Sequence, residues 1–351
     1  MNNASYKLRD FLIFVRSKRT CLPKILVIRF SSIGDIVLTT PVVRCLKMQI
    51  PGAEVHYLTK RQYLPLLEAN PYLDAIHVIG KNVTEVVPAL KAENFDFIVD
   101  LHKNLRSFIV LLQLRKPFGS FSKLNLRKFL YTKFKINLLP NVHIVDRYFA
   151  AVRKLGVTND GKGLDYSLPQ DKEINLYALP PIHQNGFVAF AIGAKQVTKA
   201  LPAEKIIAVC QKLEQPVILL GGKEDFEKGE KIREALGNKV VNACGMYSLH
   251  GSASLVKQAR IMITHDTGLM HIAAAFDKKI VSIWGNTVPQ FGMYPYLPQN
   301  PGNAVIIEVK NLKCRPCSKL GYARCPKKHF DCMMKIDENA VAEQVKNKSW
   351  D

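Results

Sequence analysis

The sequence has no apolar run long enough to cross a membrane as a helix, and it is poor in acidic residues. A membrane-spanning helix needs about 20 consecutive apolar residues, a length that no stretch of this chain approaches. The first apolar stretch is also unlike a secretory signal, because charged side chains interrupt it: Lys7, Arg9, Asp10, Arg16, Lys18 and Arg19. We therefore expect the protein to stay on the cytoplasmic side.

Acidic residues number 29 against 50 lysines and arginines, which gives a formal net charge of +21. Such an excess implies a polyanionic partner: a nucleic acid, an anionic membrane surface or a phosphorylated substrate. Between Lys103 and Lys135 there is no acidic residue, and cations alternate with Phe and Tyr. That segment suits a phosphorylated glycolipid and an anionic leaflet. A solvated face of the protein would have the same composition. Residues 6–19 suit an interfacial helix or a helix packed on the core.

The eight cysteines do not form the pattern of a secreted disulfide framework, because Cys21, Cys45, Cys210 and Cys244 are scattered. The other four form a cluster near the C-terminus, with His329 nearby: Cys314, Cys317, Cys325 and Cys332. This cluster has enough thiolates for a structural zinc ion. A second Cys-x2-Cys pair is missing, so reduced and partly buried thiols explain the cluster as well.

Short apolar strands alternate with helical patterns in both halves of the chain, which predicts parallel sheets covered by helices on both faces. The first half has strand candidates at 24–30, 53–59, 75–80 and 95–101, with one helix expected from Asp35 to Gln49. The second half has them at 186–193, 216–222, 240–245, 259–266 and 279–285. A single core rarely grows past about 250–300 residues. We therefore predict an α/β protein of two Rossmann-like domains, with a ligand cleft at the carboxyl ends of the strands.

A polar stretch rich in proline, around residues 158–185, separates the two halves. The predicted division is a basic extension, an N-terminal domain, a linker, a C-terminal domain and a final helix, at residues 1–23, 24–170, 171–185, 186–336 and 337–351. We expect the final helix to pack on the domains.

The junction SSIGD (31–35) places a lone acidic residue where the first strand turns into a helix. It is not GxGxxG, so it gives no dinucleotide fingerprint. Asp35 could cap the helix, or it could act as a catalytic base that takes a proton from an attacking hydroxyl. Taken with the other motifs, the base is favoured, and one carboxylate can fill both roles.

The junction THDTGLMH (264–271) also ends a strand and opens a helix. The free N–H groups at Thr267 and Gly268 suit a phosphate, and His271 lies one turn further on, on the face of Thr267. The plain alternative is that Asp266 and Thr267 cap the helix and that His271 is a partly buried histidine.

Two further junctions in the second half could contact a nucleotide. Lys199, shortly before Pro202, could contact a diphosphate as a cation, or it could be a solvated lysine. In GGKED (221–225), Glu224 or Asp225 could accept hydrogen bonds from ribose hydroxyls, or cap a helix.

In their order along the chain these motifs resemble the ADP-heptose:lipopolysaccharide heptosyltransferases, family 9 of the glycosyltransferases. The motifs are SSIGD, Gly193-Ala194…Lys199-x-x-Pro202 and Asp266-Thr267-Gly268-x-x-His271. The tail CRPCSKLGYARCPKKHFDCMMKI (314–336) resembles the cysteine segment of that family, so the resemblance covers residues 24–336. One departure is Leu201, where the family often has Trp.

The resemblance implies a GT-B fold, two Rossmann-like domains facing across a cleft, and an inverting, metal-independent transfer of heptose from ADP-heptose to the lipopolysaccharide inner core, with no cofactor. The C-terminal domain would hold the donor through Gly193, Ala194, Lys199, Glu224, Asp266, Thr267, Gly268 and His271. Lys199 would also assist catalysis at the diphosphate. The N-terminal domain would hold the acceptor, with Asp35 as the base and with the loop residues Ser32, Gly34, Lys103 and Arg106. We expect a peripheral protein of the inner membrane that contacts anionic lipid and no nucleic acid.

Three alternatives stay open at this point. A nucleic-acid-binding protein would explain the charge, although no RRM, KH or helix-turn-helix signature is present. A relative that binds nucleotide sugars without catalysis would share the fold. A transferase of the same class with a different donor would share both the fold and the chemistry.

Overall fold

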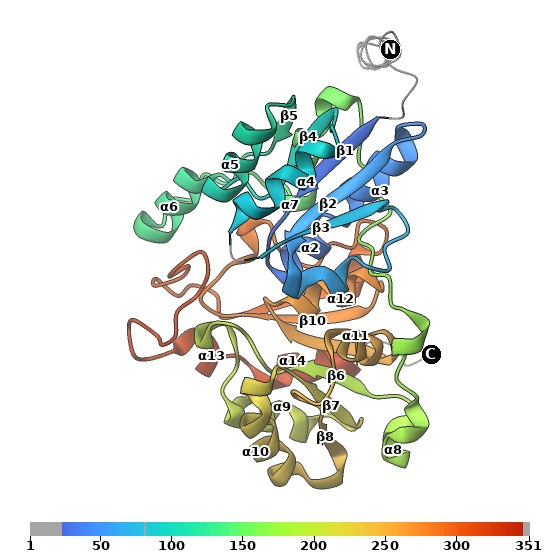
Figure 1. Ribbon diagram of the computed structural model, residues 1–351. Coiled ribbons are helices and arrows are strands. Elements are labelled where there is room, and N and C mark those ends of the chain that lie inside the picture. The colour runs from blue at the N-terminus through green and yellow to red at the C-terminus, as the bar shows by residue number, and fades with distance from the viewer. Residues whose placement is uncertain (1–22, 81, 347–351) are drawn as a thin grey trace. The chain divides into compact units, whose positions relative to one another are not determined.

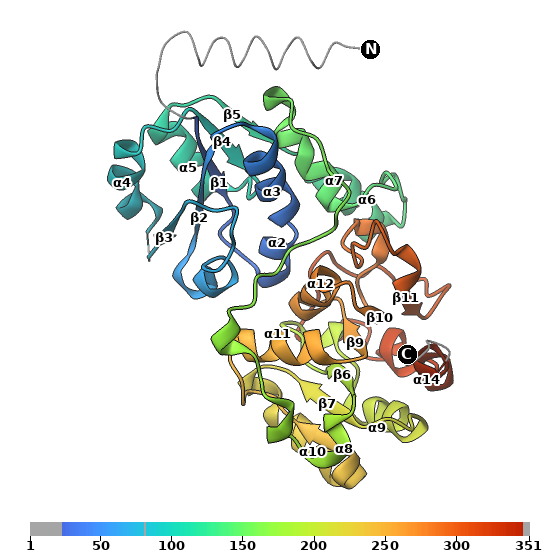
Figure 2. The ribbon, with the colours of Figure 1, turned by 90° about the vertical axis from the view of Figure 1, so that its right-hand side faces the viewer.

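The computed structural model describes residues 23–80 and 82–346. By their contacts these residues form two compact units, drawn in Figures 1 and 2. The first unit comprises the described residues up to Lys123 together with Val142–Ser167. The second comprises Leu124–Asn141 and the described residues from Leu168 onward. The predicted interfacial helix at 6–19 lies outside the described residues.

The first unit is built on a parallel sheet with the strand order β3-β2-β1-β4-β5. The strands are β1 (Lys24–Ile28), β2 (Glu54–Lys60), β3 (Ala75–Ile79), β4 (Phe97–Asp100) and β5 (Phe118–Ser120). This is the order of a doubly wound Rossmann-like sheet. The strands are all parallel, and the direction in which successive strands are added to the sheet reverses between β1 and β4. Ligands of such sheets bind beyond the carboxyl ends of the strands at that reversal.

Helices cover both faces of the first sheet, as Figure 2 shows. On one face lie α4 (Val87–Ala92) and α5 (Leu105–Leu114), and on the other lie α2 (Ile33–Val37) and α3 (Thr40–Gln49). A further helix of this unit, α7 (Ile144–Tyr148), comes later in the sequence. Leu90 of α4 and Val110 of α5 pack with strand residues such as Leu26 in one buried apolar cluster.

The second unit has a parallel sheet with the order β11-β10-β9-β6-β7-β8. Its strands are β6 (Val188–Ala191), β7 (Val217–Leu220), β8 (Val240–Asn242), β9 (Ile261–His265), β10 (Lys279–Trp284) and β11 (Ala304–Glu308). The order again matches a Rossmann-like sheet, with its reversal between β6 and β9.

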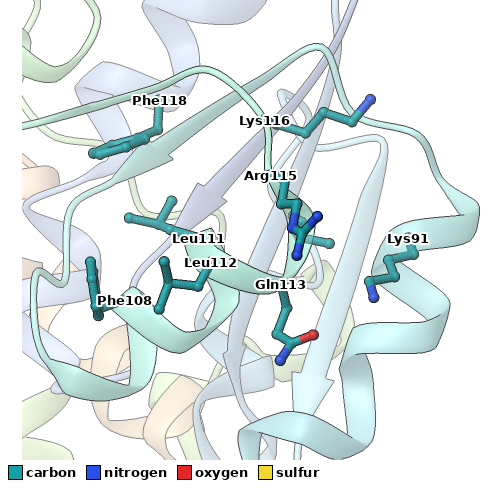
Figure 3. A pocket seen from close by; sticks show the side chains of 9 residues that line it. Lys91, Phe108, Leu111, Leu112, Gln113, Arg115, Lys116 and Phe118 are labelled. Atoms are coloured by element: carbon teal, nitrogen blue, oxygen red, sulfur yellow. The ribbon is translucent and has the colours of Figure 1, made fainter.

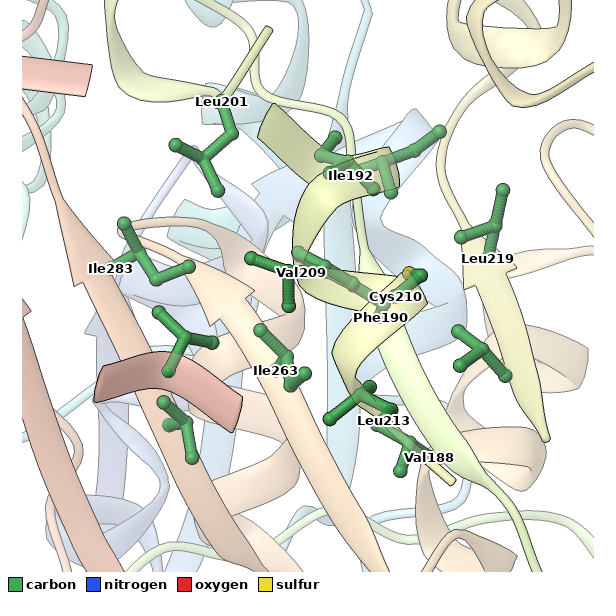
Figure 4. Close-up of a cluster of buried hydrophobic side chains, with 14 of the residues drawn as sticks. Val188, Phe190, Ile192, Leu201, Val209, Cys210, Leu213, Leu219, Ile263 and Ile283 are labelled. Atoms are coloured by element: carbon green, nitrogen blue, oxygen red, sulfur yellow. The ribbon is translucent and has the colours of Figure 1, made fainter. Parts of the chain in front are cut away.

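The helices of the second unit are α6 (Asn125–Phe134), α8 (Pro181–Gln184), α9 (Ala203–Lys212), α10 (Phe226–Leu236), α11 (Leu249–Gln258), α12 (Gly268–Ala275), α13 (Asp331–Met334) and α14 (Glu338–Lys346). Four of them, α9, α10, α13 and α14, contribute to one large apolar core against this sheet, part of which is drawn in Figure 4. Val209 of α9 and Val341 of α14 belong to this core, so the predicted final helix does pack on a domain. Over the described residues, we find no helix with the length and apolar character needed to span a bilayer.

The single helix predicted from Asp35 to Gln49 is wrong, because the structure has two helices there, α2 and α3. Pro41 has no N–H group with which to continue the hydrogen-bond ladder to the carbonyl of Val37. The hydroxyl of Thr40 donates to that carbonyl instead, over 2.8 Å. The break between α2 and α3 therefore follows from Pro41, which lies within a continuous apolar pattern.

Each strand predicted from the sequence is present, but the edge strands β5 and β11 were not predicted. The three residues of β5 (FGS) are too few to give a clear apolar pattern, whereas β11 (AVIIE) has an apolar run that was overlooked in the sequence. Residues 171–185, predicted as a linker, group with the second unit, and the Ile174 N–H donates to Ser254 Oγ over 2.8 Å.

Residues Leu124–Asn141 group with the second unit although they fall inside the range 24–170 predicted for the first domain. Lys135 Nζ donates to the carbonyls of Pro316 (2.7 Å) and Cys314 (3.1 Å). The Lys128 ammonium lies 5.6 Å from the ring centroid of Phe291. These contacts join the turn after α6 to the cysteine segment, and α6 itself to the loop after β10.

Arg44 on α3 ties a distant loop to the first sheet. Its guanidinium, only 5% exposed, donates to both oxygens of Asp160 over 2.8 Å and is also paired with Asp165. Removing one member of a buried ion pair leaves the other charges without compensation, which is costly.

We expect Arg44→Met to lower the free energy of unfolding by about 3 kcal/mol, since Asp160 and Asp165 lose their cation. Chemical denaturation with urea measures this. The matched control is Lys47→Met on the same helix, whose ion pair with Asp74 is more exposed and should be worth less than about 1 kcal/mol. Equal losses in the two variants would contradict the structural role given to Arg44.

Candidate active site

Asp35 lies in the first turn of α2, directly beyond the carboxyl end of β1. Its Oδ2 accepts hydrogen bonds from the N–H (3.1 Å) and the hydroxyl (2.8 Å) of Ser32. Its Oδ1 lies 2.5 Å from Nη2 of Arg29. The carboxylate therefore caps its helix and is also half of an ion pair, with 23% of its side chain exposed.

Arg29 holds this arrangement together, a role that was not predicted from the sequence. Its Nε donates to the carbonyl of Ser31 (2.8 Å), and its Nη1 donates to the carbonyl of Leu101 (2.5 Å). The guanidinium carbon is 5.9 Å from the ring centroid of Tyr148. A charged residue at the end of an otherwise apolar strand was the available signal, since buried arginines need partners.

The pKa of Asp35 reflects a competition between burial and its partners. Burial alone would raise the pKa, but the Arg29 charge and the hydrogen bonds from Ser32 outweigh it and hold the pKa below its ordinary value. The carboxylate is therefore ionised at neutral pH.

The loop after β4 lies beside this pair because β1 and β4 are neighbours, with Ile28 opposite Asp100. The buried Asp100 carboxylate accepts hydrogen bonds from the N–H groups of His102 (2.9 Å) and Lys103 (2.7 Å). It also accepts one from the hydroxyl of Ser107, over 2.8 Å. Asp100 thus fixes the loop in which Lys103 lies.

Two cations, Arg29 and Lys123, act on the region around the carboxylate of Asp35. Burial, and then the Arg29 charge, lowers the pKa of His102 to about 3, so this imidazole is neutral. Burial, and then the same guanidinium, also lowers the pKa of the half-buried Lys123, which lies within the electrostatic influence of Asp35. A phosphorylated ligand would relieve this concentration of positive charge.

The residues predicted for the acceptor differ in their placement. Ser32 contacts Asp35 directly, and Gly34 is buried within α2. Lys103 lies in the loop after β4, and its Nζ donates to the carbonyl of Phe121 over 2.8 Å. Arg106 is exposed in the first turn of α5.

In the second unit, Lys199 and Asp266 form an ion pair at the reversal of strand order. Lys199 Nζ lies 2.6 Å from Oδ2 of Asp266 and donates to the backbone carbonyl of the same residue over 3.2 Å. The hydroxyl of Thr287, in the loop after β10, donates to Asp266 Oδ2 over 2.9 Å. Both charged side chains are largely buried, at 18% and 12% exposure.

The cysteine segment supports the turn that carries Lys199, a relation that the sequence did not reveal. The Thr198 N–H donates to the carbonyl of Tyr322 (3.1 Å), and the Tyr322 N–H donates back to the Thr198 hydroxyl (2.8 Å). Arg315 donates to the carbonyl of Thr287 over 3.0 Å. These bonds connect the tail of the chain to the Lys199–Asp266 pair.

The turn after β6 packs against Asp225 and not against Glu224. A Cβ added to Gly193 would lie 1.8 Å from Oδ2 of Asp225, so a side chain there would have to displace this carboxylate. That carboxylate accepts the Gly222 N–H over 2.9 Å, whereas Glu224 is exposed. Lys228 Nζ donates to two carbonyls beside the same turn, those of Ile192 (3.0 Å) and Leu201 (2.6 Å). This role of Lys228 was not predicted from the sequence.

The remaining residues predicted for the donor lie at the start of α12 and in the turn after β6. Thr267 is the N-cap of α12, and its hydroxyl oxygen is 3.3 Å from that of Thr264. Gly268 is the first residue of this helix, and His271 is buried within it. Ala194, in the turn after β6, is partly exposed.

The residues considered for a metal fall in two places. Among the four clustered cysteines, burial and then Cys317 raise the pKa of the Cys332 thiol to about 12. Within the described ranges, one group has three ligand atoms less than 4.8 Å apart, formed by His56, His77 and Glu93. Its Glu93 carboxylate is already paired with Lys24 over 2.8 Å.

Two Rossmann-like sheets, with an ion pair at the reversal of strand order in each, are the architecture of glycosyltransferases of the GT-B class. The sequence profile of glycosyltransferase family 9 (heptosyltransferase) matches residues 83–323. The chain belongs to this family, which confirms the predicted family and enzyme class and sets aside the nucleic-acid-binding alternative.

Known relatives agree with this assignment. Lipopolysaccharide heptosyltransferase 3 of Escherichia coli K12 is 24% identical over 284 residues, which are 72% of this chain and 80% of that protein. The crystal structure of a family 9 glycosyl transferase from Veillonella parvula aligns with 92% of this chain and 96% of its own chain, with a TM-score of 0.73 and 23% identity. The structure of E. coli ADP-heptose LPS heptosyltransferase II aligns with 92% of this chain and 97% of its own chain, with a TM-score of 0.69 and 20% identity. The two structures confirm the predicted fold class.

We expect Arg29→Met to raise the pKa of Asp35 above its ordinary value, because burial would then outweigh the hydrogen bonds from Ser32. NMR titration of ¹³Cγ-labelled aspartate measures this, with the Asp35 signal assigned through Asp35→Asn. The control Arg106→Met removes an exposed guanidinium and should leave the titration unchanged. If the pKa of Asp35 is unchanged in Arg29→Met, the hydrogen bonds from Ser32 alone keep the carboxylate ionised. Ser32→Ala should then raise the pKa of Asp35.

Proposed function

We propose that this glycosyltransferase moves heptose from ADP-heptose to a phosphorylated inner-core acceptor of lipopolysaccharide, with inversion and without a metal ion. The observation that carries the proposal is the ionised carboxylate of Asp35, held among cations where the strand order of the first sheet reverses. The relatives of this chain include lipopolysaccharide and ADP-heptose heptosyltransferases, which supports the choice of substrates.

The acceptor would bind to the first unit. Its hydroxyl would donate to Asp35, and its phosphate groups would lie near Lys103 and Lys123, where the charge is positive. Arg29 keeps Asp35 ionised at the cost of some basicity. A weak base suffices if the hydroxyl proton leaves late, as the new C–O bond forms at an anomeric carbon that already resembles an oxocarbenium ion.

The donor would bind to the second unit. Its diphosphate would lie near Lys199 and the N-terminus of α12, which together offset the charge that develops on the leaving ADP. Asp266 would keep the ammonium of Lys199 in position and could accept sugar hydroxyls. Lys228, whose Nζ is engaged by two carbonyls, would position the turn after β6 without touching the diphosphate.

The reaction balances without a further reactant. The acceptor oxygen attacks the anomeric carbon from the side opposite to the diphosphate, which inverts the configuration. The hydroxyl proton passes to Asp35, and the electron pair of the broken C–O bond leaves on ADP. Asp35 then returns its proton to solvent.

We expect Asp35→Asn to reduce kcat by about 10²–10⁴-fold, the range for loss of a general base, and to leave ADP binding within about twofold. The assay follows heptose transfer from ADP-heptose to heptose-free inner-core lipopolysaccharide by mass spectrometry, with NMR of the product for its anomeric configuration. Wild-type activity should survive EDTA. A retained configuration, or activity lost with EDTA and restored by a metal, would contradict the mechanism.

We expect Lys199→Met to weaken ADP binding about tenfold, a typical effect of one charge-assisted contact. Isothermal titration measures the Kd, with Lys212→Met at the exposed end of α9 as the control. If UDP or GDP binds and ADP does not, the donor is different, while the fold and the transfer chemistry remain.

A further inference from the structure

Helix α5 is apolar on two faces, although only one of them packs on the sheet. Val110, Leu111 and Leu114 are buried in the core of the first unit. On the other face Leu105, Phe108 and Leu112 are 74%, 52% and 57% exposed. Residues three and four apart share one side of a helix, so these three form a continuous stripe. Large apolar side chains grouped on a surface mark an interaction site.

The stripe borders a hollow of about 900 Å³ on the first unit, shown in Figure 3. The rings of Phe108 and Phe118 lie on one side of this hollow, and the cationic groups of Lys91 and Arg115 lie on the other. Lys116 also lines it, whereas none of the aspartates and glutamates that the structure describes does. An apolar side next to a cationic side matches the layered chemistry of a lipid, with acyl chains beside a phosphate.

The charge of the border identifies the partner. A purely apolar stripe would suit another protein as well, but protein interfaces are depleted in lysine. An anionic bilayer attracts each nearby Lys or Arg and accepts Leu and Phe at the level of its headgroups. The acid-free composition of the segment from Lys103 to Lys135 is in keeping with this partner.

We propose that this surface is the membrane-docking face of the protein, formed by Leu105, Phe108, Leu112 and Phe118 with Lys91, Arg115 and Lys116, and that it lies in the interface of an anionic phospholipid bilayer. The proposal deepens the function proposed above and rests on it for its purpose, because the acceptor is itself a glycolipid. The stripe begins two residues after Lys103, so docking would bring the lipid surface to the loop beside Asp35.

The test uses the full chain and measures flotation with vesicles of phosphatidylcholine containing phosphatidylglycerol, or of phosphatidylcholine alone. We expect the triple variant Leu105→Gln, Phe108→Gln and Leu112→Gln to lower vesicle partitioning about 100-fold. The matched control, Tyr177→Gln, Ile182→Gln and Leu320→Gln, removes the same number of exposed apolar side chains from the second unit and should bind like wild type. Circular dichroism checks the folding of both variants.

The cations have their own test. Lys91→Gln with Arg115→Gln and Lys116→Gln should lower binding to the anionic vesicles about tenfold and make the remainder less sensitive to salt. Phosphatidylcholine binding should not change. If both variants float as wild type does, the docking face is overturned. A change in oligomeric state with unchanged flotation would overturn it in favour of a protein interface. Loss of flotation only on deletion of residues 1–22 would assign docking to that segment instead.

A soluble acceptor separates this proposal from the proposed function. The docking variants should transfer heptose to a delipidated inner-core oligosaccharide at the wild-type rate, because none of the changed residues touches the site. If wild type shows no transfer while flotation still depends on α5, the proposed function fails and the docking face stands. If transfer is normal and flotation is independent of α5, the reverse holds.

Discussion

The buried guanidinium of Arg29 joins three segments of the first unit that would otherwise end independently at the edge of the sheet. It donates to the carbonyls of Ser31 and Leu101 and pairs with Asp35, so the end of β1, the end of β4 and the first turn of α2 share one cation. A buried arginine is tolerated only when its donors are satisfied. Its requirement for partners therefore fixes the loops around the candidate base, and it also keeps that base ionised.

The second unit reaches a comparable result with different residues. Here the Lys199 ammonium and the Asp266 carboxylate compensate each other. The Thr287 hydroxyl donates to that carboxylate, and Arg315 donates to the backbone carbonyl of Thr287. The cysteine segment reinforces the Lys199 turn through Tyr322. In both units the charged pair lies where the strand order reverses, because the two loops that diverge there leave room for polar groups beyond the sheet.

Helix α5 links the candidate acceptor site to the surface of the protein. It starts directly after the loop that Asp100 fixes, buries one apolar face in the core and exposes another. A helix that only covered a sheet would be polar on its outer face. The second apolar face, bordered by cations, is therefore the feature of the first unit that packing alone does not explain.

The sequence by itself determined the alternation of strands and helices, the two sheets and the positions of Asp35, Lys199 and Asp266, because apolar periodicity and strand-to-helix turns are local signals. It did not reveal the role of Arg29, whose partner Leu101 is 72 residues away, or the packing of Tyr322 on Thr198, 124 residues apart. It offered Glu224 and Asp225 alike, and the fold places Asp225 against Gly193. Only the tertiary structure decided these points, because the register of parallel strands sets which distant loops meet, and a hydrogen bond forms only between groups brought within about 3 Å.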